Sequence, residues 1–195
     1  MSDLNPIGGT SGDDNIAGTS AGDVINGNAG DDVIGAGGAS DIIHGNAGND
    51  TIDGGANRDK LYGDEGNDTL LGRGSNDKLY GGVGNDYLDG GDADDRLYGG
   101  DGDDTIIGGD GNDVLYGDNA NDGNDDEAGV DTFVFDADDG SDKVFDFQSG
   151  QDKIALTEGG SYTLTTSGSN TILTYGATTV IFYDEVVVDS DIVFV

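Results

Sequence analysis

The stretch GGDGDDTIIGGDGNDVLY, residues 99–116, decides the fold of this protein because it contains the same nine-residue pattern twice. Each copy begins with two glycines, has aspartate at its sixth position and has isoleucine or leucine at its eighth. The stretch carries several acidic side chains and no basic one. A fold that brings these carboxylates together therefore needs a cation between them.

The nine-residue register starts at Gly9 and continues to Val134, which makes fourteen units. Position six is aspartate in all fourteen, and position eight is isoleucine or leucine in the first twelve, followed by Asn124 and Phe133. One apolar residue in nine cannot build a core unless many copies stack. A fixed period of this kind predicts stacked units that share one continuous core.

Each unit is predicted to form a glycine-rich turn of six residues and a strand of three residues whose middle side chain points inward. Two units then make one turn of a flattened coil. The turns of the odd-numbered units line one side of the stack, here called the odd edge, and those of the even-numbered units line the even edge. The predicted organisation is a lead-in at residues 1–8, the repeats at 9–134 and a C-terminal region at 135–195.

The composition points to cations as the binding partners. The chain has 195 residues, a formal net charge of -34, and 37 Asp against only 4 Glu. Aspartate is the carboxylate that turns favour, because its short side chain bonds to the nearby backbone. The negative charge argues against nucleic acid and anionic membrane surfaces as partners. The chain has no cysteine and no apolar run long enough to span a membrane.

Stacking places the position-six carboxylates of neighbouring coils close together, where they repel one another unless a cation lies between them. Calcium suits an irregular cage of carboxylate and carbonyl oxygens better than magnesium does, and glycine lets carbonyls turn inward. The alternative is that these residues only form Asx turns without a metal. The predicted calcium ligands are Asp14, Asp23, Asp32, Asp41, Asp50, Asp59, Asp68, Asp77, Asp86, Asp95, Asp104 and Asp113, with Gly12, Gly30, Gly48, Gly66, Gly84 and Gly102 at position four of the odd units.

The two edges differ in sequence. In the first five even units, position four is Ala21, Ala39, Asn57, Ser75 and Ala93, and Arg58 at position five places a cation beside a predicted cation site. If position four needs a positive φ, a residue other than glycine is strained there. We therefore predict strong calcium sites on the odd edge and weaker or vacant sites along part of the even edge. The alternative is that both edges fill equally.

A column of tyrosines lies beside a column of basic residues in the even units. Positions seven and nine flank the inward residue and so share the outer face of the strand. Aromatic rings beside basic side chains could bind an acidic polysaccharide. The candidate ligand face consists of Lys60, Tyr62, Lys78, Tyr80, Arg96 and Tyr98. The alternative is that tyrosine fills a pleated exposed surface while the bases relieve charge repulsion.

Three units, GNAGNDTID at 45–53, GDEGNDTLL at 63–71 and GGDGNDVLY at 108–116, closely resemble the calcium-binding nonapeptide of RTX (repeats-in-toxin) proteins. The resemblance spans Gly9 to Val134. It implies an all-β fold, a right-handed parallel β-roll or β-solenoid with two nonapeptides per turn, and multiple Ca²⁺ ions held between the turns. It also implies export by a type I secretion apparatus through an uncleaved C-terminal signal.

The two ends of the sequence agree with such an export route. The start, MSDLNPIGGT, lacks the basic and apolar regions of a cleaved secretory signal. Residues 129–156 and the ending DIVFV, residues 191–195, are similar to the tails of exported RTX proteins. The segments SYTLTT, TILTYG and TTVIFYDEVVV read as strands, which predicts a C-terminal β-strand cap over the end of the stack. We expect a secreted protein, extracellular or associated with the cell surface.

Catalysis finds little support in the sequence. His44 is the only histidine, and the abundant carboxylates are accounted for by metal ligation. We therefore expect a non-enzymatic, secreted calcium-binding β-roll that folds on extracellular calcium and has a structural or binding role. The alternative is a polysaccharide-binding accessory module of an extracellular enzyme, by analogy with the RTX modules of mannuronan epimerases.

Overall fold

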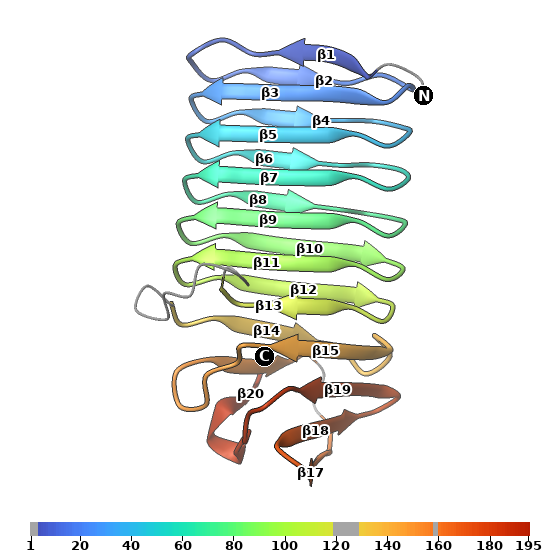
Figure 1. Cartoon of the computed structure of the whole chain (residues 1–195), viewed down its shortest axis with the longest axis vertical. Helices are drawn as coiled ribbons and strands as arrows, with labels where there is room; N and C mark the ends of the chain where they lie inside the picture. Colours follow the sequence, from blue (N-terminus) through green and yellow to red (C-terminus); the bar gives the residue numbers. More distant parts are fainter. Residues whose placement is uncertain (1–3, 119–128, 158–159) are drawn as a thin grey trace.

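The computed structural model describes residues 4–118, 129–157 and 160–195. The chain winds into a tall stack of coils, and each coil contributes one strand to each of two sheets (Figure 1). The eleven-stranded sheet follows the order β1 (Asn5–Gly8), β3 (Asp23–Ala29), β5 (Ile42–Ala47), β7 (Lys60–Glu65), β9 (Lys78–Val83), β11 (Arg96–Asp101), β13 (Val114–Tyr116), β15 (Ser141–Phe145), β19 (Thr178–Phe182), β18 (Asn170–Tyr175) and β17 (Tyr162–Ser167).

The second sheet has nine strands and lies opposite the first. Its order is β2 (Asn15–Ala17), β4 (Val33–Gly35), β6 (Thr51–Asp53), β8 (Thr69–Leu71), β10 (Tyr87–Asp92), β12 (Thr105–Asp110), β14 (Thr132–Phe135), β16 (Lys153–Leu156) and β20 (Ile192–Phe194). Apart from the short 3₁₀ helix η1 (Asp189–Asp191), the described residues contain no helix. None of them forms a helix that could span a membrane.

The strand register confirms two nonapeptides per turn. Leu61 pairs with Leu79 in the first sheet and Ile52 pairs with Leu70 in the second, in both cases in parallel and 18 residues apart. Several strands of the first sheet are longer than the three residues predicted. In β7, for example, pairing continues past Gly63 to Glu65.

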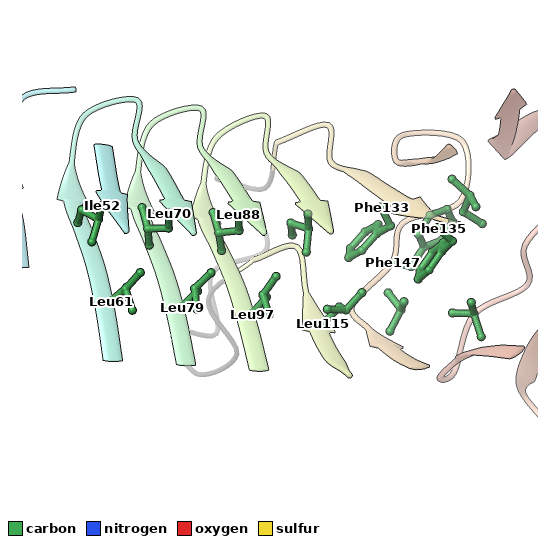
Figure 2. Packing of buried hydrophobic residues seen from close by; sticks show 14 of the residues in the cluster. Ile52, Leu61, Leu70, Leu79, Leu88, Leu97, Leu115, Phe133, Phe135 and Phe147 are labelled. Carbon is green, nitrogen blue, oxygen red and sulfur yellow. The ribbon is translucent and has the colours of Figure 1, made fainter. Parts of the chain in front are cut away.

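The core is a double row of position-eight side chains. Ile52, Leu70 and Leu88 project from the second sheet toward Leu61, Leu79 and Leu97 of the first (Figure 2). Each of these six side chains is fully buried, as the period-two alternation of a strand requires. Near the C-terminal end Phe133, Phe135 and Phe147 widen the core (Figure 2). Stacking thus turns one apolar residue per unit into a continuous core.

The fourteenth repeat departs from the predicted alternation. Phe133 pairs with Ile106, so the fourteenth unit joins the strands of the odd units, 27 residues further along instead of 18. The expectation that the fourteenth unit occupies the even edge was therefore wrong. Phe133 is fully buried and supplies the apolar side chain of the core at this level. Most of the thirteenth unit, including Asn124, lies outside the described residues.

Parallel pairing continues beyond Val134. Strand β15 pairs with β13, and β16 pairs with β14, so the region after the repeats adds further coils. At the end of the first sheet β17, β18 and β19 form an antiparallel meander (Figure 1). The antiparallel strands end the stack of coils, as the predicted C-terminal cap requires.

Candidate metal centres along the two edges

The position-six aspartates form two continuous hydrogen-bonded ladders. The backbone N–H of each aspartate donates to Oδ1 of the aspartate one coil further along, as from Asp50 to Asp68 on the odd edge and from Asp59 to Asp77 on the even edge, both at 2.7 Å. Position six lies two residues before the buried position eight, so both side chains point inward. The sheet register thus holds every carboxylate against the next coil.

In ten of these carboxylates the second oxygen has no hydrogen-bond partner. The shared feature is a buried Oδ2 without a hydrogen bond, found at Asp32, Asp41, Asp50, Asp59, Asp68, Asp77, Asp86, Asp95, Asp104 and Asp113. None of these side chains is more than 3 % exposed. A buried carboxylate oxygen without a partner is strongly unfavourable. Two rows of five such oxygens, one on each edge, therefore fit bound cations.

Glycine at position one places a backbone carbonyl beside that oxygen. A Cβ atom added at Gly63 would collide with Oδ2 of Asp68 and with the carbonyl oxygen of Gly81 in the next coil. The same relationship holds at Gly81 toward Asp86 and the carbonyl of Gly99. The free carboxylate oxygen and a carbonyl of the following coil thus share the space between two turns. The predicted ligands include the glycines of position four but not those of position one, which have this role.

The donor set suits calcium. Among the residues that the structure describes, no three acidic or histidine side chains cluster into a metal cage. A cation between two turns would therefore take few carboxylate oxygens and complete its shell with backbone carbonyls. Calcium accepts six to eight such oxygens in irregular geometry, whereas magnesium demands a near-ideal octahedron.

Burial raises the pKa of interior ladder carboxyls such as those of Asp68, Asp86 and Asp104, and the charge of neighbouring carboxylates raises it further. The pKa is raised to about 6 at Asp68, about 7 at Asp86 and about 8 at Asp104. The N–H donated by the preceding coil lowers each pKa and only partly offsets burial. The even edge behaves alike, with pKa values of about 7 at Asp59, Asp77, Asp95 and Asp113. Without a cation the folded ladder would thus hold protons near neutral pH.

Position four has a positive φ on both edges from Gly30 to Gly102. On the odd edge φ lies between 109° and 137° at Gly30, Gly48, Gly66, Gly84 and Gly102. On the even edge Ala39, Asn57, Ser75 and Ala93 adopt left-handed φ between 75° and 84°. A side chain at such a φ is strained, so position four is less favourable on the even edge than on the odd edge. Gly12 and Ala21, in the first coil, do not have a positive φ.

A second ladder of hydrogen bonds, formed at position five, distinguishes the two edges. On the odd edge the side-chain oxygen at position five accepts the N–H of position five one coil further along, as from Asn67 to Asn49 and from Asn85 to Asn67. Among the described residues of the even edge, Asp94 alone accepts such a bond, from Asn112. Arg58 instead donates from Nε to the carbonyl oxygen of Asn76 at 3.1 Å. The free Oδ2 atoms occur on both edges, but the odd edge has the more completely bonded turns.

In the first coil, the position-six carboxylates accept hydrogen bonds that the sequence did not predict. Oδ2 of Asp14 accepts hydrogen bonds from the backbone and hydroxyl of Thr10, and Oδ2 of Asp23 accepts the same pair from Thr19. These oxygens already have partners, unlike those of the next ten ladder aspartates. The structure therefore brings Asp14, Asp23 and Gly12 into the edges without the free oxygen that marks the later turns.

The ladders continue into the C-terminal region, which the predicted site residues did not include. Asp104 donates to Asp131, Asp131 to Asp152 and Asp113 to Asp142, each at 3.0 Å. All three acceptors precede an inward apolar residue by two positions, as position six does in the repeats. That Asp-x-apolar spacing, without any glycine pattern, is the signal that could have revealed Asp142 and Asp152.

The candidate ligand face is assembled as predicted, but its rings stack on one another. His44, Tyr62, Tyr80, Tyr98 and Tyr116 form a continuous pile with centroids 4.4–4.8 Å apart and nearly parallel planes. Lys60, Lys78 and Arg96 pair in register on neighbouring strands of the same face. Because each ring face within the pile covers the next, the interior rings present their edges to solvent.

Comparison with known protein families identifies the repeats. The family model described as the RTX calcium-binding nonapeptide repeat matches four times, at residues 8–40, 35–70, 62–97 and 89–123, which together cover more than half of the chain. The protein belongs to the family of RTX calcium-binding nonapeptide-repeat proteins, as the resemblance of its units predicted. A search of curated proteins found no match.

Two solved structures are similar to this chain. The extracellular lipase LipA from Serratia marcescens is 19% identical, with a TM-score of 0.35; the match covers 100% of this chain and 41% of the lipase. The AlgE6R3 subunit of the Azotobacter vinelandii mannuronan C5-epimerase is also 19% identical, with a TM-score of 0.26, and the match covers 98% of this chain and 83% of that subunit. The chain thus spans less than half the length of the lipase.

Proposed function

We propose that this RTX β-roll is a secreted, non-enzymatic protein that folds when it meets extracellular calcium and then serves a structural or binding role. The observation that carries the proposal is the set of ten buried, unpartnered Oδ2 atoms on the two edges. Bound calcium would supply positive charge and coordination to these oxygens. The chain's own residues supply the rest: aspartates hold the oxygens in place, and glycines at position one admit the neighbouring carbonyls.

The link to folding follows from charge and core size. With a net charge of -34 and one core residue per nonapeptide, the chain without a counter-cation repels itself and buries little apolar surface for its length. Because the binding site exists only in the folded chain, the free energy of ion binding adds to the free energy of folding. Extracellular calcium modules bind at roughly 10⁻⁴–10⁻³ M, so this switch would act outside the cell and leave the chain unfolded inside it.

Export is the second element of the proposal. An unfolded chain can be threaded through a type I secretion apparatus, and the resemblance of the C-terminal region to exported RTX tails supports this route. Strands β15, β16, β19 and β20 of that region continue the two sheets, so the same segment could both direct export and start the stack of coils. Deletion of residues 189–195 should abolish export while calcium-dependent folding of the purified chain persists.

The experiment that tests calcium-driven folding is far-UV circular dichroism of the purified, metal-free chain titrated with calcium from micromolar to 10 mM, with magnesium as control. We expect a cooperative rise in β signal with calcium alone. A chain already fully folded without metal, or one that folds equally well with magnesium, would contradict the proposal.

Calcium is proposed to bind more strongly along the odd edge. The supporting observations are the bonded position-five ladder of that edge and the left-handed non-glycine residues of the other. If ions counted during the titration bind with equal affinity along both edges, the alternative in which both edges fill together is supported and the stronger odd edge is contradicted.

A non-enzymatic role agrees with the engagement of the only histidine. Nδ1 of His44 lies 2.9 Å from Oδ2 of Asp64, and its ring stacks on Tyr62. The side chain is thus part of the outer face of the first sheet. Loss of any hydrolytic activity on substitution of His44 by Gln would contradict this role.

The second candidate function is that of a polysaccharide-binding accessory module. Lys60, Lys78 and Arg96 form an in-register basic column in a strongly acidic chain, and the tyrosine edges beside them can offer hydroxyl groups. The stacked rings favour charge and hydrogen bonding over ring stacking as the means of recognition. Retention of the protein on immobilised alginate, lost on replacement of the three bases by Gln, would support this function; unchanged retention would exclude the column as the binding surface.

A further inference from the structure

The first coil of the roll contains a threonine at position two on each edge, and nowhere else in the repeats does position two carry threonine. The residues are Thr10 and Thr19. In the units from Asn28 to Gly109 position two is glycine, asparagine, aspartate or arginine, and it has a positive φ in each of them. Neither threonine does. Because a β-branched side chain is rarely tolerated in the left-handed region, threonine holds these two turns in a different conformation.

In that conformation each threonine binds the ladder aspartate of its own unit. The N–H and the hydroxyl of Thr10 both donate to Oδ2 of Asp14, at 2.5 and 2.9 Å. The N–H and the hydroxyl of Thr19 donate to Oδ2 of Asp23, at 2.7 and 3.0 Å. Each hydroxyl oxygen in turn accepts the N–H two residues further on, at Gly12 and Ala21. The arrangement is the same on both edges.

The bonded oxygen is the equivalent of the free oxygen in the later turns. A Cβ atom at Gly9 would meet Oδ2 of Asp14 and the carbonyl of Gly27, just as one at Gly63 would meet Oδ2 of Asp68 and the carbonyl of Gly81. On the odd edge, the space between the first and second coils thus has the same walls as the later spaces. Here, however, threonine donors already satisfy the carboxylate.

We propose that the first coil, residues 9–26, is a calcium-independent cap of the roll, in which Thr10 and Thr19 take the place that calcium has in the later turns. This inference rests on the proposed calcium binding. It adds that the calcium sites begin at Asp32 on the odd edge and at Asp41 on the even edge, which are the first ladder aspartates with a free Oδ2. The cap ends the row of carboxylates without an ion.

The chain offers a matched test, because the turn GTSGDD of residues 9–14 differs from the calcium-type turn GNAGDD of residues 27–32 at only two positions. The double substitution Thr10→Asn, Ser11→Ala makes the two turns identical. It removes both the hydroxyl and the β-branch, so Asp14 should regain a free Oδ2. The single substitution Ser11→Ala keeps Thr10 and serves as the control.

The measurement is the number of calcium ions bound per chain at saturation, by equilibrium dialysis and native mass spectrometry. We expect the double variant to bind one more ion than the natural chain and Ser11→Ala to bind the same number. We also expect Asp14→Asn to leave the number unchanged, whereas Asp68→Asn, in an interior turn of the same edge, lowers it.

An unchanged number in the double variant, or the loss of an ion in Asp14→Asn, would overturn the cap while leaving calcium binding by the later turns intact. Failure of the natural chain to bind calcium would instead remove the proposed function and the cap with it. The two failures are thus distinguished within one experiment.

Discussion

The backbone N–H of Asp50 donates a 2.7 Å hydrogen bond to Oδ1 of Asp68 one coil further along, while Oδ2 of Asp68 is buried without a partner. One carboxylate therefore performs two separate tasks. Its first oxygen ties neighbouring coils together, and its second remains available for a cation. Because asparagine can accept the same N–H but carries no charge, the two tasks can be separated by substitution.

The first prediction concerns Asp68→Asn. The amide oxygen can still accept the N–H of Asp50, so the coil contact should persist while the charged oxygen is lost. We expect the calcium midpoint of folding, followed by circular dichroism, to rise about tenfold, which corresponds to ~1.4 kcal/mol. Asp92→Asn, with the same charge change at an exposed side chain, is the control and should shift the midpoint little. Equal shifts in the two variants would show that only net charge matters.

The second prediction concerns Gly63→Ala. The added Cβ would collide with Oδ2 of Asp68 and the carbonyl of Gly81. We expect the free energy of unfolding in saturating calcium to fall by about 1–3 kcal/mol, as overpacking usually costs, together with the loss of calcium binding at that turn. Gly74→Ala is the control, since a Cβ there meets nothing within 4 Å. Similar behaviour of the two variants would argue against a close carbonyl and carboxylate at position one.

The third prediction concerns pH. The folded-state pKa of ladder carboxyls lies at about 6 to 8, as at Asp68 and Asp104, whereas an unfolded aspartate titrates near ~3.9. Between these values the folded, metal-free chain binds more protons than the unfolded chain. Its stability is therefore fully present below the unfolded pKa and is lost as the pH rises through the folded values.

Metal-stripped protein should thus gain β signal when the pH is lowered from about 8 to about 5. Protons compete with the cation for the same oxygens, so the calcium concentration that half-saturates the sites of the folded chain should rise over the same interval. Circular dichroism of the metal-free chain checks the first effect, and calcium-binding titrations of the folded chain at several pH values check the second. Half-saturation at a calcium concentration independent of pH would mean that the ladder carboxyls titrate normally.

The fourth prediction concerns Arg58→Asn on the even edge. Asparagine could accept the N–H of Asn76 and so restore the position-five contact that the odd edge has at every interior turn. We expect the calcium midpoint to fall about threefold, in line with the ~0.5–1.5 kcal/mol of an ordinary hydrogen bond. Arg73→Asn removes the same charge from an exposed ion pair with Asp53 and should have a smaller effect. A higher midpoint in Arg58→Asn would show that the guanidinium itself stabilises this edge.

The fifth prediction concerns the ring pile. Tyr80 stacks on Tyr62 and Tyr98 with centroids 4.8 Å apart. Tyr80→Ala removes both contacts and should lower the free energy of unfolding in saturating calcium by about 1–3 kcal/mol. Tyr80→Phe keeps the ring and should be nearly neutral, as measured by thermal unfolding. A large loss in the phenylalanine variant would point to the hydroxyl group instead of stacking.

The sequence by itself determined the period, the parallel coil and the positions of the core and carboxylate ladders. These features repeat every nine residues, and a turn followed by a short strand is encoded within each unit. Leu61, Leu79 and Leu97 could be placed in the core, and Asp59 and Asp77 on the even edge, without knowledge of any distant contact.

Only the tertiary structure decided which partner each group meets. The different bonding of the two oxygens of Asp68 and the face-to-face stacking of Tyr80 depend on contacts between neighbouring coils. The hydrogen bond from Thr10 to Oδ2 of Asp14 depends on the conformation of a single turn. The repeat pattern alone does not specify any of these contacts. The placement of Phe133 opposite Ile106 likewise depends on which unit can supply an apolar side chain to the growing core. The nine-residue repeat specifies the shape of a coil. The packing and charge of the adjoining coils decide which contacts each side chain makes and where a cation is needed.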